Sequence, residues 1–408
     1  MTPPENSEVL DTTARIRELV EAGDVDALAP VLSDLHPSDV ADILESLDDE
    51  AARLALVRAL PAEQASEALA EMEEGEDRGD LLGALHPRLG AELLHELADD
   101  DAADLIAELE PESARAILEV LPEEEAGELR GLLQYGEETA GGLMTTDLVA
   151  VEAHLTAGDS IQEIRRKGRE VVDFYTVFVV DRLGRLVGAV PLDELILANP
   201  DMPVSDITEP IPVTIHPELD QEEVGRVLSR YNLVSVPVVD ASDRLLGRIT
   251  FDDVIDVIEA EQTEDILRMV GISGDEEELR SDWKETIRSR LPWLTLNLVT
   301  AGAAASVVLL FEDILNQVWF LAAIMPIIAG MGGNSGTQAL AVTVRRLALG
   351  EGPLERKRDA VGKEVVVGLL NGIALGVMAA LVAQVAVVTV DGIDPRLPLV
   401  VLFAMWGT

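Results

Sequence analysis

The sequence predicts a multidomain protein with an all-α helical solenoid, a tandem α/β module, a connecting helix and an α-helical transmembrane domain. Three patterns support this order: a leucine repeat, a duplicated strand–strand–helix pattern, and long uncharged apolar runs near the end. The predicted segments are a flexible N-terminus at 1–24, the solenoid at 25–135, the tandem module at 136–260, the connecting helix at 261–284 and the transmembrane domain at 285–408.

The predicted solenoid is marked by apolar residues that recur every 12 or 13 positions. Most are followed by a polar cluster containing Pro with Ser, Asp or Glu, which is a start signal for a helix. The spacing predicts helices of about two turns, stacked on one another. Solenoids bind partners or act as levers, and a plain packed helical domain is the alternative. The repeat positions are Leu35, Leu47, Leu60, Met72, Leu85, Leu97, Leu109 and Leu121.

The tandem module contains two β-rich runs of similar texture, DFYTVFVVD at 173–181 and LVSVPVVD at 233–240. Each is followed by a polar turn, a second apolar run and a helix, which predicts two copies of one α/β unit. The pattern resembles a pair of CBS domains. That resemblance implies an adenine-nucleotide site formed by a Thr and a nearby Asp, matched here by Thr250 and Asp253. The first unit has Pro191 at the Thr position, so binding of a nucleotide such as ATP stays open.

A helix predicted from Asp252 to Asp265 leads from this module toward the membrane. Asp253, Asp256 and Glu264 lie near one face, and Glu261 and Asp265 are four residues apart. Like charges at that spacing destabilise a helix unless something neutralises them. Carboxylate oxygens without His or Cys suit Mg²⁺ or Ca²⁺. A solvated acidic helix face is the simpler alternative.

The charge of the chain is strongly asymmetric. The net charge is −47, and about −48 of it comes from residues 1–282, whereas residues 283–408 carry about +1. Such a field repels nucleic acid and attracts cations, so we expect no nucleic-acid partner. A generally acidic, salt-adapted proteome would also produce this excess. The chain has no cysteine, which excludes disulfides and thiolate metal sites.

The last third predicts three membrane spans and part of a fourth. Uncharged runs cover 291–311, 318–344 and 365–390, and each is long enough to cross a bilayer. Basic residues precede the first run and fill the loop after the second, which predicts a multi-pass protein of the cytoplasmic membrane with its N-terminal domains in the cytoplasm. The fourth run starts at Leu397 and has only about 12 residues before Thr408, so we expect a fragment that lacks the rest of this span.

The second apolar run contains an unusual polar, glycine-rich segment, Met325–Gln338, with the letters MPIIAGMGGNSGTQ. Unpaired backbone at membrane depth is tolerated only where it lines a cavity or packs against protein. We therefore predict that this segment lines a pathway, with Asn334 as the first ligand candidate. Thr337 and glycine carbonyls such as that of Gly330 would support it.

Taken together, the chain resembles the MgtE family of magnesium channels and transporters. The residues that carry this resemblance are ETAGGLMT at 138–145, RLPWL at 290–294 and the 325–338 segment. The family implies a homodimer with a Mg²⁺-selective pore that closes when Mg²⁺ bridges carboxylates of the cytoplasmic domains. It also implies an acidic residue in the last span, beyond Thr408. The matching regulatory positions are Asp100, Asp104, Glu222, Asp253, Asp256, Glu261, Glu264 and Asp265.

The sequence thus predicts a Mg²⁺ transport protein rather than an enzyme. Two other functions remain open at this point. One is a membrane-anchored metal or nucleotide sensor without transport, and the other is a transporter of another divalent cation such as Co²⁺ or Mn²⁺.

Overall fold

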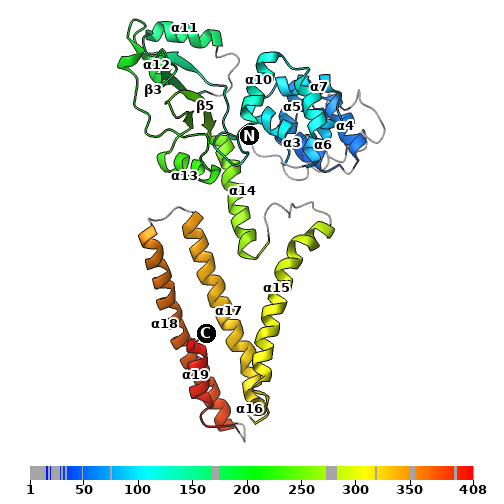
Figure 1. Ribbon diagram of the computed structural model, residues 1–408, viewed down its shortest axis with the longest axis vertical. Helices are drawn as coiled ribbons and strands as arrows, with labels where there is room; N and C mark the ends of the chain where they lie inside the picture. Colours follow the sequence, from blue (N-terminus) through cyan, green and yellow to red (C-terminus); the bar gives the residue numbers. More distant parts are fainter. Residues whose placement is uncertain are drawn as a thin grey trace. The chain divides into compact units, whose positions relative to one another are not determined.

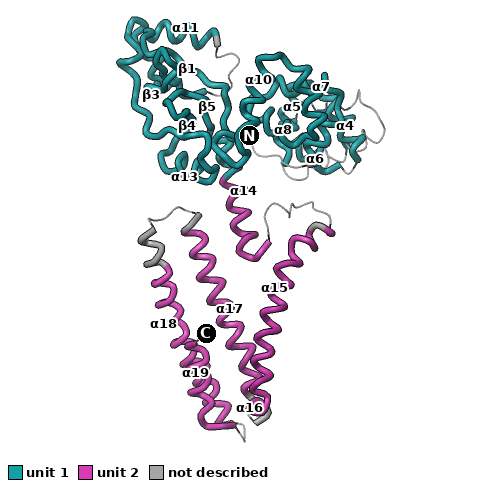
Figure 2. The backbone as a smooth tube through the Cα atoms, viewed as in Figure 1, with its two compact units in different colours: residues 1–257 teal, residues 258–408 magenta. Residues whose placement is uncertain are grey.

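The computed structural model divides the chain into two compact units, Met1–Val257 and Ile258–Thr408 (Figure 2). Most of the predicted N-terminal segment 1–24 lies outside the described residues. The structure describes residues 15, 16, 19, 28, 31, 32, 35–47, 49–73, 76–167, 174–272, 283–317, 319–348, 354–389 and 393–407.

The first unit begins with a series of short helices of eight to ten residues each (Figure 1). Proline and a polar neighbour start several of them: Pro37 and Pro87 occupy the first turns, and the preceding His36 and His86 accept backbone N–H bonds at the caps. The helices are α3 (Pro37–Glu45), α4 (Glu50–Ala59), α5 (Ala62–Ala70), α6 (Glu76–Gly83), α7 (Pro87–His95), α8 (Asp99–Ala107), α9 (Pro111–Leu118) and α10 (Glu123–Leu132).

The apolar repeat marks the ends of these helices. From Leu47 onward each repeat residue follows one of these helices, and most of the repeat residues are buried, which removes their apolar side chains from water. The predicted period of 12 to 13 residues therefore corresponds to one helix and its turn. The repeat residues that are at most 9% exposed are Leu47, Leu60, Met72, Leu85, Leu109 and Leu121.

Two α/β units follow the helices. In the first, β2 pairs in parallel with β1 and antiparallel with β3; in the second, β4 and β5 form an antiparallel pair. The elements of the first are β1 (Ala150–Glu152), α11 (Ala157–Lys167), β2 (Thr176–Val180), β3 (Leu186–Pro191) and α12 (Leu192–Leu197). Those of the second are a 3-10 turn (Val204–Asp206), α13 (Gln221–Tyr231), β4 (Ser235–Val239) and β5 (Leu245–Thr250).

The two α/β units exchange edge pairings. The segment that enters the first unit pairs with the second through a Thr145–Arg248 bridge, and the segment that enters the second pairs with the first through a Glu209–Ala189 bridge. Glycine allows both close approaches. A Cβ added at Gly247 would lie 2.6 Å from the Thr145 carbonyl oxygen, and one at Gly188 would lie 2.5 Å from the Glu209 carbonyl oxygen.

Helix α14 (Phe251–Met269) follows β5 directly and runs for 19 residues. It contains the whole helix that the sequence predicted from Asp252 to Asp265. Val254 and Val257 provide its buried side. The helix is therefore continuous across residue 260, where the sequence predicted a domain boundary.

The end of α14 is a Schellman turn. Gly271, at φ +78°, donates its N–H to the Arg268 carbonyl at 3.1 Å, and Ile272 donates to the Leu267 carbonyl at 3.0 Å. A Cβ on Gly271 would lie 2.3 Å from the indole ring of Trp293. The backbone conformation and the indole thus both require glycine at this position.

The second unit continues with α15 (Trp283–Leu309), α16 (Glu312–Gln317), α17 (Trp319–Ala348), α18 (Leu354–Thr389) and α19 (Leu397–Gly407) (Figure 1). Within its described residues, two helical segments, Thr286–Leu309 and Val361–Thr389, are long and apolar enough to cross a membrane. They coincide with the first and third predicted spans. The second predicted span is the 30-residue α17, whose polar residues lower its hydropathy, and the fourth is the 11-residue α19.

Two of the three evenly spaced glycines of α18 allow close packing with α19. A Cβ at Gly372 would lie 3.0 Å from the Met405 carbonyl oxygen, and one at Gly376 would lie 2.9 Å from the Leu402 carbonyl oxygen. Gly368, one turn earlier, has no neighbour within 4 Å. Small residues let membrane helices approach to backbone contact, so this ridge sets the spacing of the two helices.

Candidate functional site

The first turn of α8 carries three consecutive aspartates, Asp99, Asp100 and Asp101. The Oδ1 atom of Asp100 is buried and has no hydrogen-bond partner among the described residues. Its burial, together with the nearby Asp101, Asp253 and Asp99, raises the pKa of Asp100 well above its usual value. The structure therefore brings together two predicted ligands, Asp100 and Asp253, from the helical domain and the second α/β unit.

Sequence reasoning missed the two neighbours of Asp100. Loss of solvent around the Asp101 carboxyl and the proximity of Asp253 raise the pKa of Asp101 to about 6, although part of the residue stays exposed. Asp99 binds the turn at Thr145 and Thr146. The run of three aspartates at the start of a helix could have indicated this site. It is not specific, because acidic residues in a first turn also stabilise a helix through its dipole.

Asp253 lies in the first turn of α14 and is bonded to the end of β5. The Thr250 hydroxyl donates to Asp253 Oδ2 at 2.6 Å, and the Thr250 N–H donates to the same oxygen at 3.2 Å. Burial raises the pKa of Asp253, and the bonds from Thr250 oppose that rise. At the corresponding position in the first unit, Pro191 offers neither a hydroxyl nor an N–H.

Two of the other predicted regulatory carboxylates, Glu222 and Glu264, form ion pairs with arginines. Glu222 forms an ion pair with Arg226 on α13, and Glu264 forms one with Arg268 on α14. In the described part of the chain, no three Asp, Glu or His side chains are arranged to hold a metal ion. The buried, unpartnered Asp100 oxygen and the hard oxygen donors beside it nevertheless suit Mg²⁺. Asp104 lies one turn after Asp100 on α8, and Asp256, Glu261 and Asp265 lie along α14.

The predicted pathway residues lie on α17. The expectation of a loosely packed glycine backbone is wrong, because α17 is a continuous helix through 325–338. Its carbonyls are engaged in helical hydrogen bonds, and the Gly333 carbonyl also accepts the Thr337 hydroxyl at 3.1 Å. Side chains such as those of Asn334 and Thr337, rather than the Gly330 carbonyl, are therefore the groups available to bind an ion. Gly330, Asn334 and Thr337 follow at intervals of four and three residues, along one face.

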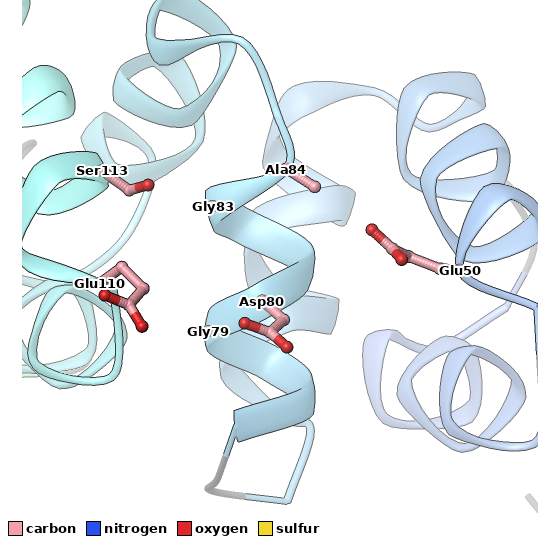
Figure 3. Close-up of a pocket in the computed structure, with 7 residues that line it drawn as sticks. All are labelled: Glu50, Gly79, Asp80, Gly83, Ala84, Glu110 and Ser113. Atoms are coloured by element: carbon pink, nitrogen blue, oxygen red, sulfur yellow. The ribbon is translucent and has the colours of Figure 1, made fainter.

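A pocket of about 290 Å³ in the helical domain does not coincide with any predicted site (Figure 3). Figure 3 shows Glu50 and Glu110 on either side of α6, with Asp80 between them. It is lined by Glu50, Gly79, Asp80, Gly83, Ala84, Glu110 and Ser113.

Comparison with known protein families matches most of the chain in four segments. Residues 16–138 match the MgtE intracellular N domain, 140–201 and 204–260 each match a CBS domain, and 325–408 match a divalent cation transporter family. The magnesium transporter MgtE of Thermus thermophilus is 34% identical over 363 residues, which are 88% of this chain and 80% of that protein. The chain belongs to the MgtE family of magnesium transporters.

Two further MgtE proteins align over shorter stretches. That of Enterococcus faecalis is 35% identical over 64% of this chain and 57% of its own length, and that of Bacillus subtilis is 32% identical over 62% and 56%. The chain thus spans just over half the length of these two MgtE relatives.

Two solved structures resemble the N-terminal part of this MgtE-family chain. The crystal structure of the soluble part of a magnesium transporter has 31% identity and a TM-score of 0.55, and covers 62% of this chain and 99% of that one. The cytosolic domain of the Mg²⁺ channel MgtE in complex with ATP has 34% identity and a TM-score of 0.57, and covers 60% and 99%. The helical domain and CBS pair therefore have the architecture of an MgtE cytosolic part.

Proposed function

We propose that this chain conducts Mg²⁺ across the cytoplasmic membrane, and that Mg²⁺ held by its acidic cytoplasmic domains closes the pathway. Membership of a magnesium-transporter family supports the first statement. The acidic contact between Asp100 and Asp101 of α8 and Asp253 of α14 supports the second, because Asp100 Oδ1 is buried there and no described residue forms a hydrogen bond with it. A bound divalent cation would supply the positive charge that this contact needs.

The electrostatics of this contact make it responsive to a cation. Asp100, Asp101 and Asp253 repel one another, and each loses hydration in the contact. Without a cation, the repulsion favours separation of the helical domain from the CBS pair. When a cation is bound, the same oxygens favour the docked arrangement. The gain in free energy equals the difference between their affinity for the ion in the docked state and in the separated state.

For the pathway, we propose that the face of α17 with Asn334 and Thr337 contacts the ion. Mg²⁺ gives up its water reluctantly, so amide and hydroxyl groups that hold a hydrated ion are adequate ligands. Both residues are exposed in the single chain. Polar groups of this kind inside a membrane need protein or water around them, which favours a homodimer in which two copies enclose the pathway.

We propose further that the second CBS unit binds ATP at Thr250 and Asp253. The support is the Thr250–Asp253 hydrogen bond, which orients a hydroxyl and a carboxylate at the start of α14, and the ATP complex of the related cytosolic domain. The basic residues within 284–290 and 345–363 support a cytoplasmic location for these domains.

The decisive experiment measures Mg²⁺ flux into proteoliposomes that contain the protein together with any natural sequence that follows Thr408, while Mg²⁺ on the cytoplasmic side is varied. We expect Asn334→Ala to reduce the flux and Asp100→Asn with Asp253→Asn to maintain it at Mg²⁺ concentrations that close the wild type. Glu112→Gln removes an exposed charge on α9 and serves as the control.

Three outcomes would contradict the proposal. Absence of flux in the wild type would favour a sensor without transport. Closure that is unchanged in the double variant would remove the α8–α14 contact from the mechanism. If Co²⁺ or Mn²⁺ reduced the Mg²⁺ flux at lower concentrations than added Mg²⁺ itself, one of these ions would be the preferred substrate.

A further inference from the structure

Asp99 joins α8 to the CBS pair through several hydrogen bonds. Its Oδ1 accepts from the Thr145 hydroxyl at 2.5 Å and from the Thr146 N–H at 3.0 Å. Its Oδ2 accepts from the same N–H at 3.0 Å and from the Thr146 hydroxyl. Hydrogen bonds to an ionised carboxylate are about twice as strong as neutral ones, and these need no metal.

The turn that Asp99 binds is itself fixed to β5. Thr145 and Arg248 exchange backbone N–H···O bonds of 2.9 Å each, and Arg248 Nε donates to the Asp147 carbonyl at 2.9 Å. Thr145 is only 3% exposed and Arg248 only 7%. Gly247 leaves no room between this turn and the strand. A movement of the turn relative to β5 would break these bonds, so the two move together.

This arrangement connects Asp99 to the acidic contact from both sides. On one side Asp100 is the next residue of α8. On the other side β5 ends at Thr250, whose hydroxyl holds Asp253. The bonds of Asp99 therefore hold in register the same two segments that the repulsion between Asp100 and Asp253 drives apart.

We infer that Asp99, together with Thr145 and Thr146, forms a metal-independent anchor that docks α8 on the CBS pair and sets the Mg²⁺ concentration at which the acidic contact closes. The inference deepens the proposed Mg²⁺ regulation and rests on it. Asp99 acts as a positioning residue: it places Asp100 and Asp101 opposite Asp253, and its own oxygens are occupied by hydrogen bonds.

The absence of native cysteine in the sequence allows a direct test with two labels on the full-length protein. Cysteines replace the exposed Glu119 at the end of α9 and the exposed Ser229 on α13, and pulsed electron spin resonance measures the distance between them. Mg²⁺ is titrated at constant ionic strength. The midpoint of the distance change and the docked fraction without Mg²⁺ are the two readouts.

The anchor predicts that Asp99→Asn, and separately the double variant Thr145→Val with Thr146→Val, raise the Mg²⁺ midpoint by about tenfold. Both lower the docked fraction without Mg²⁺. Saturating Mg²⁺ restores the wild-type distance, which loss of folding would not allow. The Thr145→Ser, Thr146→Ser double variant keeps both hydroxyls and should stay near the wild type. Glu112→Gln removes one charge elsewhere on the helical domain and is the matched control.

Two results would overturn the anchor. One is a wild-type midpoint and docked fraction in the double valine variant. The other is a shift in Asp99→Asn that the valine variant does not share, because Asp99 would then act as a metal ligand. A wild type without any Mg²⁺ response would instead refute the proposed regulation, and the docked fraction without Mg²⁺ would still decide whether the anchor exists.

Discussion

The two CBS units share one scaffold but differ where the second hairpin strand ends. In the first unit β3 ends at Pro191 and leads into α12, which has six residues. In the second, β5 ends at Thr250 and leads into the 19-residue α14. Thr250 binds Asp253, whereas proline has no donor to offer. At these two strand ends, the second unit has a hydroxyl bonded to a carboxylate and continues through α14 into the second compact unit, whereas the first has proline.

The shared part extends to the hairpin turns. Asp181 and Asp240 each accept backbone N–H bonds within their turn, chiefly from Arg185 and Arg244, and this lowers the pKa of both aspartates. Each hairpin also has a register shift near its turn, and the turns bond to each other through Leu186 N–H and the Asp243 carbonyl at 2.8 Å. These contacts hold the two hairpins together at their turns. They do not involve the far ends of β3 and β5, where the two units differ.

The largest expected contrast is in nucleotide binding. Thr250→Val removes the hydroxyl and its bond to Asp253, and we expect ATP affinity of the full chain to fall by about tenfold to a hundredfold, as for loss of a hydrogen bond to a charged group. Pro191→Thr at the corresponding position of the first unit should leave the affinity unchanged. Isothermal titration calorimetry measures both. Equal losses in the two variants would show that the units do not differ in this role.

A smaller loss of stability, similar in both units, is expected when Gly188 or Gly247, the glycines at the two edge pairings, is replaced by alanine. Gly188→Ala places a methyl group 2.4 Å from the Thr208 methyl, and Gly247→Ala places one 2.6 Å from the Thr145 carbonyl oxygen. Overpacking of this kind costs about 1–3 kcal/mol. Thermal unfolding followed by circular dichroism should show a lower midpoint for both variants. Gly127→Ala, where a Cβ meets nothing within 4 Å, is the control. A change in only one unit would argue against matched edge pairings.

The smallest expected effect is the pH dependence of docking at the α8–α14 contact in the absence of Mg²⁺. The pKa of Asp101 is raised to about 6, and those of Asp100 and Asp253 are also raised, so the docked state holds protons that the separated segments release. Docking is therefore favoured at low pH, and this contribution is lost as pH rises through about 6.

Hydrogen–deuterium exchange in EDTA, corrected for intrinsic exchange rates, measures this dependence. We expect α8 and the first turn of α14 to be better protected at about pH 5 than at about pH 8. Helix α12 of the first unit lies outside the contact and provides the internal control. Better protection of α8 at the higher pH would contradict the sign of the pKa shifts.

The fold could be predicted where a period recurs, whereas Asp100 and Asp253 of the site were predicted to act together only through the family resemblance, because they are far apart in sequence. The leucine repeat and the duplicated hairpins indicated the helical domain and the CBS pair because burial imposes its period on the sequence. The pairing of Asp99 with Thr145 joins residues 46 positions apart, and no local pattern reports such a contact. The prediction of irregular backbone in the glycine-rich run of α17 was wrong, because the helix pairs the backbone groups of this run internally, as an apolar surrounding requires.

The continuity of α14 has a mechanical consequence. A helix of 19 residues without a break behaves as a stiff rod of about 28 Å, at about 1.5 Å per residue. A tilt of about 10° at the Asp253 end would displace the Met269 end by about 4 to 5 Å over that length. Small rearrangements among the aspartates would thus be amplified geometrically along the helix as far as Met269, just before the turn at Gly271.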